Sequence, residues 1–130
     1  MEIVIYTNNS KVKHFYQETN EVRFQTKQDL ISLLEDVKVA VDRGCRILSD
    51  PIYSCLESPE NPYKSIAVTK ETYDDNEDQQ KMIEGSISIA KKIENRKKFF
   101  DFKEENLEQY RFIDLNLLRD FITKFEVWTR

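Results

Sequence analysis

Glycine and proline are scarce in this sequence, with two glycines and three prolines among 130 residues. This scarcity excludes a collagen-like chain, a flexible linker and a nucleotide-binding loop built from glycines. No stretch approaches the roughly 18 consecutive apolar residues of a membrane-spanning helix. Lysine and arginine total 20 against 24 aspartates and glutamates, so the net charge is −4 rather than the basic balance of a dedicated nucleic-acid binder. We therefore expect neither nucleic acid nor a membrane as a partner.

Histidine and cysteine are also rare. The single histidine, His14, leaves almost no material for a histidine metal cluster or a Ser-His-Asp triad, and we expect it on a helix surface. Cys45 and Cys55 form neither a CxxC pair nor a dense disulfide framework, so reduced thiols in a cytoplasm fit better than a bridge. The sequence predicts a cytoplasmic protein with no metal, no cofactor and no identifiable catalytic residue, and it gives little support to an enzyme.

Apolar residues are frequent enough for a packed core, and the length fits one domain over residues 1–130. Continuous apolar runs and one alternating segment predict five strands. These strands cover residues 3–7, 21–25, 46–49, 64–70 and 110–113. Apolar residues at helical spacing predict four helices. The helices cover residues 11–19, 26–43, 76–97 and 114 onward, with Thr26 and Asp114 as N-caps and Gly44 just past the second helix.

The alternation of strands and helices predicts a layered α/β domain with a mostly parallel five-strand sheet flanked by helices. The link over residues 51–63 contains all three prolines and no helical period. A parallel crossover needs a dozen or more residues and usually a helix, so we expect strand 64–70 to run antiparallel to strand 46–49. The link then returns the chain to the carboxyl ends of the first three strands.

Open α/β sheets bind ligands beyond the carboxyl ends of their strands, and polar residues gather at those positions here. The candidate ligand-binding residues are Asn8, Asn9, Ser10, Asp50, Tyr63 and Lys64. Helix amides and lysines favour a small anion. The alternatives are structural. The asparagines and the serine would cap a helix, Asp50 would bind loop amides, and Tyr63 would pack on proline while Lys64 reaches water.

Three segments carry a resemblance to a known family: residues 6–9 (YTNN), 42–51 (DRGCRILSDP) and 59–65 (PENPYKS). Together with Phe112-Ile113-Asp114 near the end, they resemble the GrdX family along the whole chain. These small proteins are encoded with the glycine, sarcosine and betaine reductases of anaerobic amino-acid fermenters. Two family histidines are replaced here by Cys45 and Asp50, so no role of those histidines transfers. The resemblance implies a pathway and no catalytic residues.

Two hypotheses of function follow. The first is a non-catalytic accessory protein that docks on reductase subunits through the loop 51–64 and an aromatic C-terminal region, unless those aromatics are ordinary core. The aromatic residues concerned are Phe99, Phe100, Phe102 and Trp128. The second is a domain, or a weak enzyme, that binds a small anion or an amino-acid-derived ligand at the predicted sheet edge. A structural homodimer is also compatible with the sequence.

Overall fold

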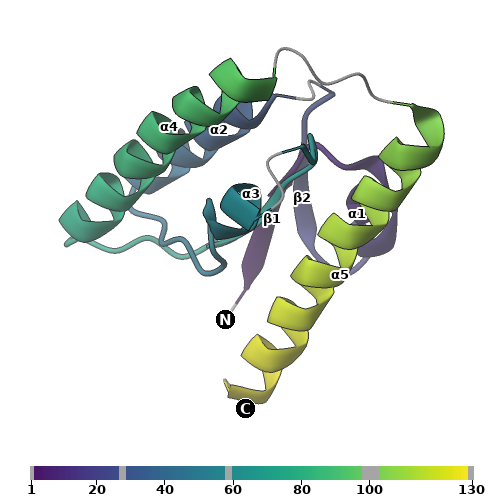
Figure 1. Ribbon diagram of the computed structural model, residues 1–130. Coiled ribbons are helices and arrows are strands. Elements are labelled where there is room, and N and C mark those ends of the chain that lie inside the picture. Colours follow the sequence, from purple (N-terminus) through teal and green to yellow (C-terminus); the bar gives the residue numbers. More distant parts are fainter. Residues whose placement is uncertain (1, 27–28, 58–59, 98–102, 129–130) are drawn as a thin grey trace.

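The computed structural model describes residues 2–26, 29–57, 60–97 and 103–128 (Figure 1). Within these residues the chain forms β1 (Ile3–Thr7), α1 (Ser10–Tyr16), β2 (Glu21–Phe24), α2 (Leu30–Asp42), α3 (Tyr53–Glu57), β3 (Ser65–Thr69), α4 (Glu77–Lys97) and α5 (Glu104–Trp128). The strands make one mixed sheet in the order β2-β1-β3. In this sheet β1 runs parallel to β2 and antiparallel to β3.

The sheet lies between two pairs of helices, with α2 and α4 side by side on one face and α1 and α5 on the other (Figure 1). Strand β1 is buried along its whole length, and its side chains alternate between the two faces. Val4 and Tyr6 pack with α2 and α4, whereas Ile3 and Ile5 pack with α1 and α5. The continuous apolar run of β1 is thus explained by helices covering both faces.

The predicted five-strand, mostly parallel sheet is wrong: the described residues form a three-strand mixed sheet. The segment 46–49 runs beside β3, but only Ile47 forms a bridge, antiparallel to Val68. Side chains replace part of the ladder there, because Ser49 Oγ accepts from the Ala67 amide and Gln79 Oε1 accepts from the Ile47 amide. The predicted antiparallel direction of segment 64–70 relative to segment 46–49 is confirmed by this bridge. The link before it was predicted to contain no helix, but its residues Tyr53–Glu57 form α3.

The predicted fifth strand at 110–113 is also wrong, because these residues lie inside the 25-residue helix α5. Asp114 is therefore not an N-cap but a buried residue within that helix. Segment 110–113 is short and apolar, and such a run does not by itself distinguish a strand from part of a helix. The spacing of Asp114, Leu118 and Ile122 instead places residue 114 on the buried stripe of one continuous helix.

Three chain breaks depend on single polar or glycine residues. Asn9 caps α1, and Asp29 rather than Thr26 caps α2, since Asp29 Oδ1 accepts from the Ile31 amide. Gly44 follows α2 with a φ of 112°, as its sequence position predicted. At the other glycine, Gly85, no atom lies within 4 Å of the position that its Cβ would take.

The structure shows whether several other side chains considered in the sequence are buried or exposed. His14 is exposed, as predicted, and Cys45 is buried. Trp128 is 86% exposed and does not belong to the core. Phe99, Phe100 and Phe102 lie outside the described residues. Among the helices that the structure describes, none combines the length and the apolar character needed to cross a membrane.

Candidate functional site

The proline-bearing link returns to the carboxyl end of β1. There the Asn8 side chain forms hydrogen bonds with the end of the link through both its oxygen and its nitrogen. The Lys64 amide donates to Asn8 Oδ1 at 2.9 Å, and Asn8 Nδ2 donates to the Pro62 carbonyl at 3.0 Å. Asn8 is 3% exposed, so these bonds form in a site that water barely reaches. The predicted meeting of the first strand with Tyr63 and Lys64 is therefore present in the fold.

Asn9 joins α1 to α5. Its Oδ1 accepts from the Lys11 amide at 3.0 Å, which caps α1. Its Nδ2 donates to the Arg111 carbonyl at 2.8 Å and to Asp114 Oδ2 at 3.0 Å. The Asn9 side chain is fully buried, and the hydrogen bonds just described are all made within the protein.

Asp114 places a carboxylate inside the protein, beside β1 and β3. Its Oδ2 accepts from Asn9 Nδ2 and from Ser65 Oγ at 2.7 Å, and Ser65 Oγ is also 2.6 Å from Thr7 Oγ1. Burial raises the pKa of Asp114 above its ordinary value. The hydrogen bonds from Asn9 and Ser65 and the positive charge of Lys64 act in the opposite direction and lower that pKa.

A pocket of about 330 Å³ opens next to this carboxylate, and we call it the Asp114 pocket. Its lining combines titratable, hydroxyl and apolar side chains. The residues are Ser49, Asp50, Glu57, Lys64, Ser65, Asp114, Leu117, Leu118 and Phe121. A smaller cavity of about 150 Å³ adjoins it and shares Glu57, Asp114 and Leu117. Lys64 is 6% exposed, so a lysine and an aspartate that are both buried line one small cavity.

The structure brings together two of the six predicted site residues in the Asp114 pocket. Asp50 and Lys64 line it, and Asp50 Oδ1 also accepts from the Ile52 amide, as the structural alternative expected. Tyr63 lines the smaller cavity.

The other three predicted residues do not line either cavity. Asn8 and Asn9 instead hold the segments that form the pocket. Ser10 is the exposed first residue of α1. A ligand role for these three residues stays a prediction.

Asp114, Ser49, Ser65 and the apolar residues of α5 also line the pocket, and none of them was predicted as a site residue. A signal for Asp114 was present: it is a carboxylate at the position where the apolar stripe of Leu118 and Ile122 continues toward the N-terminus. A charged residue on a buried helix stripe requires a partner, and that requirement marks a site.

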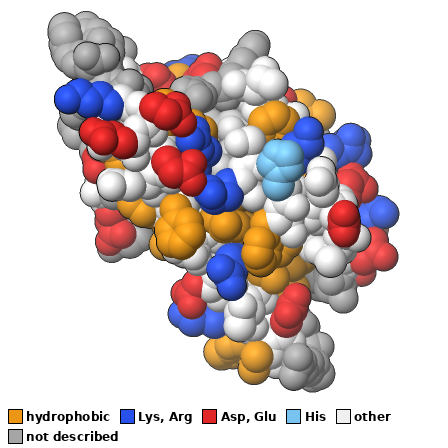
Figure 2. Space-filling view, turned by 90° about the vertical axis from the view of Figure 1, so that its right-hand side faces the viewer, with side chains coloured by type: hydrophobic (Ala, Val, Ile, Leu, Met, Phe, Trp, Pro, Cys, Tyr) orange, Lys and Arg blue, Asp and Glu red, His pale blue; other side chains and the backbone are white. Residues whose placement is uncertain are grey.

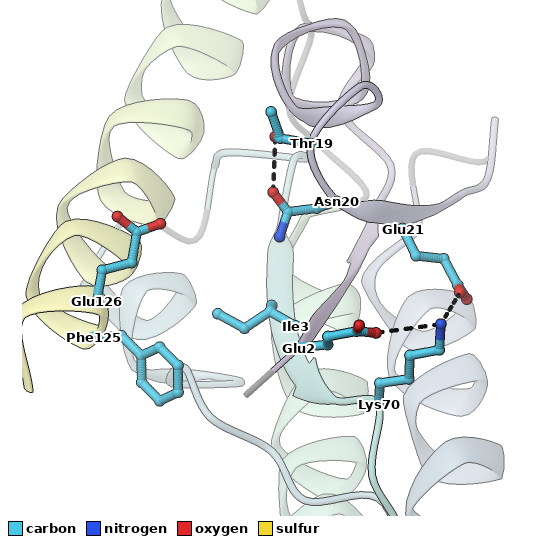
Figure 3. A pocket seen from close by; sticks show the side chains of 8 residues that line it. All are labelled: Glu2, Ile3, Thr19, Asn20, Glu21, Lys70, Phe125 and Glu126. Atoms are coloured by element: carbon cyan, nitrogen blue, oxygen red, sulfur yellow. Dashed lines mark hydrogen bonds and ion pairs between the residues drawn. The ribbon is translucent and has the colours of Figure 1, made fainter. Parts of the chain in front are cut away.

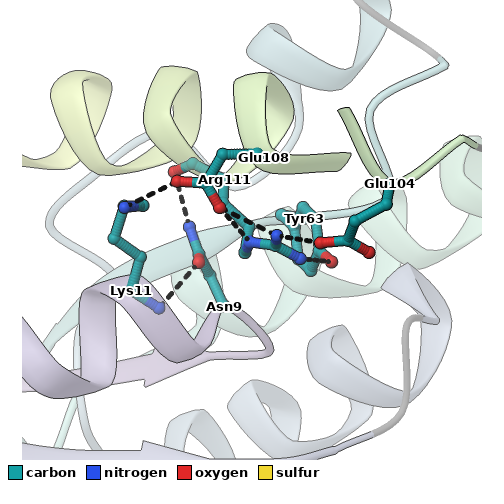
Figure 4. Close-up of polar contacts among 6 residues, drawn as sticks. All are labelled: Asn9, Lys11, Tyr63, Glu104, Glu108 and Arg111. Carbon is teal, nitrogen blue, oxygen red and sulfur yellow. Dashed lines mark hydrogen bonds and ion pairs between the residues drawn. The ribbon is translucent and has the colours of Figure 1, made fainter. Parts of the chain in front are cut away.

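Arg111 fastens the start of α5 beside this site (Figure 4). Its guanidinium donates to Tyr63 Oη at 2.9 Å and to the carboxylates of Glu104 and Glu108 at 2.6 Å and 2.8 Å. Lys11 of α1 pairs with Glu108 at 2.8 Å. The hydrogen bonds to Glu104 and Glu108, which lie in the same helix, raise the pKa of Arg111. The Arg111–Tyr63 hydrogen bond joins α5 to the link, and the Lys11–Glu108 ion pair joins α5 to α1.

A second cavity, of about 380 Å³, lies at the opposite end of β1 around Glu2 and Ile3 (Figure 3). Lys70 there pairs with Glu2 at 3.3 Å and with Glu21 at 3.9 Å. These charged groups are well exposed and screened by water, so they neutralise one another at the surface. Despite its larger volume, this cavity is a weaker candidate than the Asp114 pocket, in which Lys64 and Asp114 are buried.

Among the described residues, no three His, Cys, Asp or Glu side chains gather closely enough to hold a metal ion. A search of curated proteins and a search of solved structures each found no match to the chain. A family model described as GrdX-like protein matches residues 4–123, which is most of the sequence and includes every residue of the Asp114 pocket. The chain belongs to the GrdX-like protein family.

Proposed function

We propose that this protein is a small-molecule-binding protein whose Asp114 pocket takes one amino acid or a closely related zwitterion. The observation that carries the proposal is that buried Lys64 and buried Asp114 line the same small cavity. Asp50 and Glu57 add two further carboxyl groups to the lining. The carboxylate of a zwitterionic ligand would pair with the positive Lys64, and its ammonium group would pair with the acidic side chains.

The charge balance favours a zwitterion over the simple anion predicted from the sequence. Three acidic side chains line the pocket against one lysine, so a pure anion meets more repulsion than attraction. A pure amine brings a second positive charge next to the buried Lys64 ammonium group. In the bound complex we place the ligand carboxylate toward Lys64 and its ammonium group toward the acidic residues.

The test is isothermal titration of the wild-type protein with the twenty common amino acids. Acetate and phosphate serve as pure anions, and ethylamine serves as a pure cation. We expect saturable one-site binding of at least one amino acid and none of the simple ions. Tighter binding of phosphate or acetate than of every amino acid contradicts the proposal, as does the absence of any amino-acid binding.

Lys64→Met tests whether the pocket is the binding site, because methionine keeps much of the aliphatic stem and removes the charge. Losing a buried charge-assisted contact of about 1.5–3 kcal/mol weakens binding at least tenfold. Lys70→Met is the matched control: it follows β3 directly but lines the cavity at the other end of the sheet. Equal affinity of both variants places the ligand elsewhere.

A role as a non-catalytic accessory protein of a glycine-reductase-type system is a second candidate. Exposed aromatic side chains favour it: Phe15 of α1 is 51% exposed and Phe112 of α5 is 52% exposed. Hydrophobic side chains gather beside the single histidine on the face formed by α1 and α5 (Figure 2). Such exposed apolar patches are typical of interaction sites.

The accessory role is tested by mixing the tagged protein with purified reductase subunits and measuring complex formation by size-exclusion chromatography. We expect a complex that Phe15→Ser combined with Phe112→Ser disrupts. Separate elution of the wild-type protein from every subunit counts against the accessory role and leaves the ligand proposal standing.

A further inference from the structure

The apolar and the polar lining residues of the Asp114 pocket come from two different parts of the chain. Its apolar lining residues all come from α5, namely Leu117, Leu118 and Phe121. Its polar residues, apart from Asp114, come from chain segments that precede α4. Leu117 and Phe121 are four residues apart and lie on the same face of α5, and Leu118 borders that face on the side of the core, so we call the three side chains the α5 wall.

This wall is held in place by the core behind it. Leu118 is 3% exposed and packs in the cluster with Ile5 and Val12. The Phe121 ring stacks on Phe125, with ring centroids 5.7 Å apart. Leu117, in contrast, is 52% exposed, so its side chain has apolar surface left for a ligand to cover.

We propose that the ligand is an amino acid with an apolar side chain, of the leucine or phenylalanine class, whose side chain packs on Leu117 and Phe121. This inference rests on the proposed function and adds the class of side chain. The polar lining residues bind the charged end of the ligand, and the α5 wall packs against its apolar side chain. A volume of about 330 Å³ lies at the small end of ligand pockets, which suits one free amino acid rather than a peptide.

A homologous series measures the contribution of the wall. We expect affinity to rise from glycine through alanine and 2-aminobutyrate to leucine, by about fourfold for each methylene group buried. Serine should bind more weakly than 2-aminobutyrate, because its hydroxyl loses water against an apolar surface. Equal affinity for glycine and leucine overturns this inference while leaving amino-acid binding intact. Failure of every amino acid to bind overturns both proposals.

Leu117→Ala locates the side-chain contact, with Leu56→Ala as its matched control. Both leucines are helical and 52% exposed, but Leu56 lines neither the Asp114 pocket nor the cavity beside it. Leu117→Ala should weaken leucine binding about tenfold and leave glycine binding unchanged, whereas Leu56→Ala should alter neither. Circular dichroism confirms that both variants are folded. Leucine affinity that falls equally in both variants, or in neither, overturns the proposed contact.

Discussion

The Asn9 side-chain amide donates to the Asp114 carboxylate at 3.0 Å, across 105 positions of sequence. Asn9 caps α1 two residues after the end of β1, and Asp114 lies inside α5, so this contact joins the last helix to the segment that leaves the sheet. Neighbouring Ser65 donates to the same carboxylate oxygen from β3. The pocket that we propose as the ligand site is built beside these bonds.

Asn9→Ala should lower the free energy of unfolding by about 2–4 kcal/mol. The change removes the α1 cap, worth about 1 kcal/mol, and leaves the Asp114 carboxylate and the Arg111 carbonyl short of a donor. Urea unfolding measures the loss. Asn116→Ala, on the exposed side of α5, is the control and should change stability by no more than about 0.5 kcal/mol. Equal losses in the two variants would show that Asn9 has no structural role.

Asp114→Asn should alter how stability depends on pH. Burial raises the pKa of Asp114 above its ordinary 3.8, so the folded state keeps a proton that the unfolded chain has already released. That contribution to stability is complete below the ordinary pKa and is lost as pH rises through the higher folded value. Asparagine does not ionise. The variant should therefore gain stability relative to wild type as pH rises from about 4.

The measurement for Asp114→Asn is urea unfolding of both proteins over a series of pH values upward from about 3.5. Asp120→Asn, an exposed carboxylate of the same helix, is the matched control. A stability difference between Asp114→Asn and wild type that stays constant across the series contradicts the pKa direction given for the buried carboxyl.

Two glycine substitutions should have opposite effects. At Gly44 the φ of 112° disfavours any side chain, and a Cβ would lie 2.8 Å from the Tyr73 carbonyl oxygen. Gly44→Ala should therefore cost more than about 2 kcal/mol. At Gly85, on the exposed side of α4, a Cβ meets nothing within 4 Å, so Gly85→Ala should add about 0.5–1 kcal/mol. Thermal unfolding of both variants tests this pair, and a shift of the same sign in both refutes it.

Tyr63→Phe removes the phenol oxygen that accepts from Arg111 at 2.9 Å, within a residue that is 5% exposed. We expect a loss of about 0.5–1.5 kcal/mol, the usual net value of one hydrogen bond. Tyr73→Phe removes a hydroxyl whose bond to Glu71 is 3.5 Å long and exposed, so it should stay within about 0.5 kcal/mol of wild type. Guanidinium unfolding measures the stability of both variants. A larger loss in Tyr73→Phe than in Tyr63→Phe would contradict the role given to the Tyr63 hydroxyl.

Local patterns predicted those parts of the fold that depend on neighbours in sequence. The five-residue apolar run 3–7 is a strand, and the stripe of α2 ends before Gly44. Segment 64–70 runs antiparallel as predicted, although its link contains the helix α3. The same approach failed at 46–49 and 110–113. A short apolar run has no period of its own, and its partners decide between strand, bridge and helix.

The candidate site was predicted only in part for the same reason. Asp50 and Lys64 follow from their positions near strand ends, and both line the pocket. Asp114 was assigned to a helix start, where carboxylates are common, and its burial was not foreseen. Its position depends on Asn9 and Ser65, which lie 105 and 49 residues away in sequence.

The sequence by itself determined the α/β class, the breaks at Asn9 and Gly44, the direction of β3 and the family, since each depends on composition or on residues close together in the chain. Only the tertiary structure decided the size of the sheet and the enclosure of a lysine and an aspartate in one cavity. Backbone ladders and buried charges are stabilised by partners from distant segments, and those partners meet only when the chain has folded.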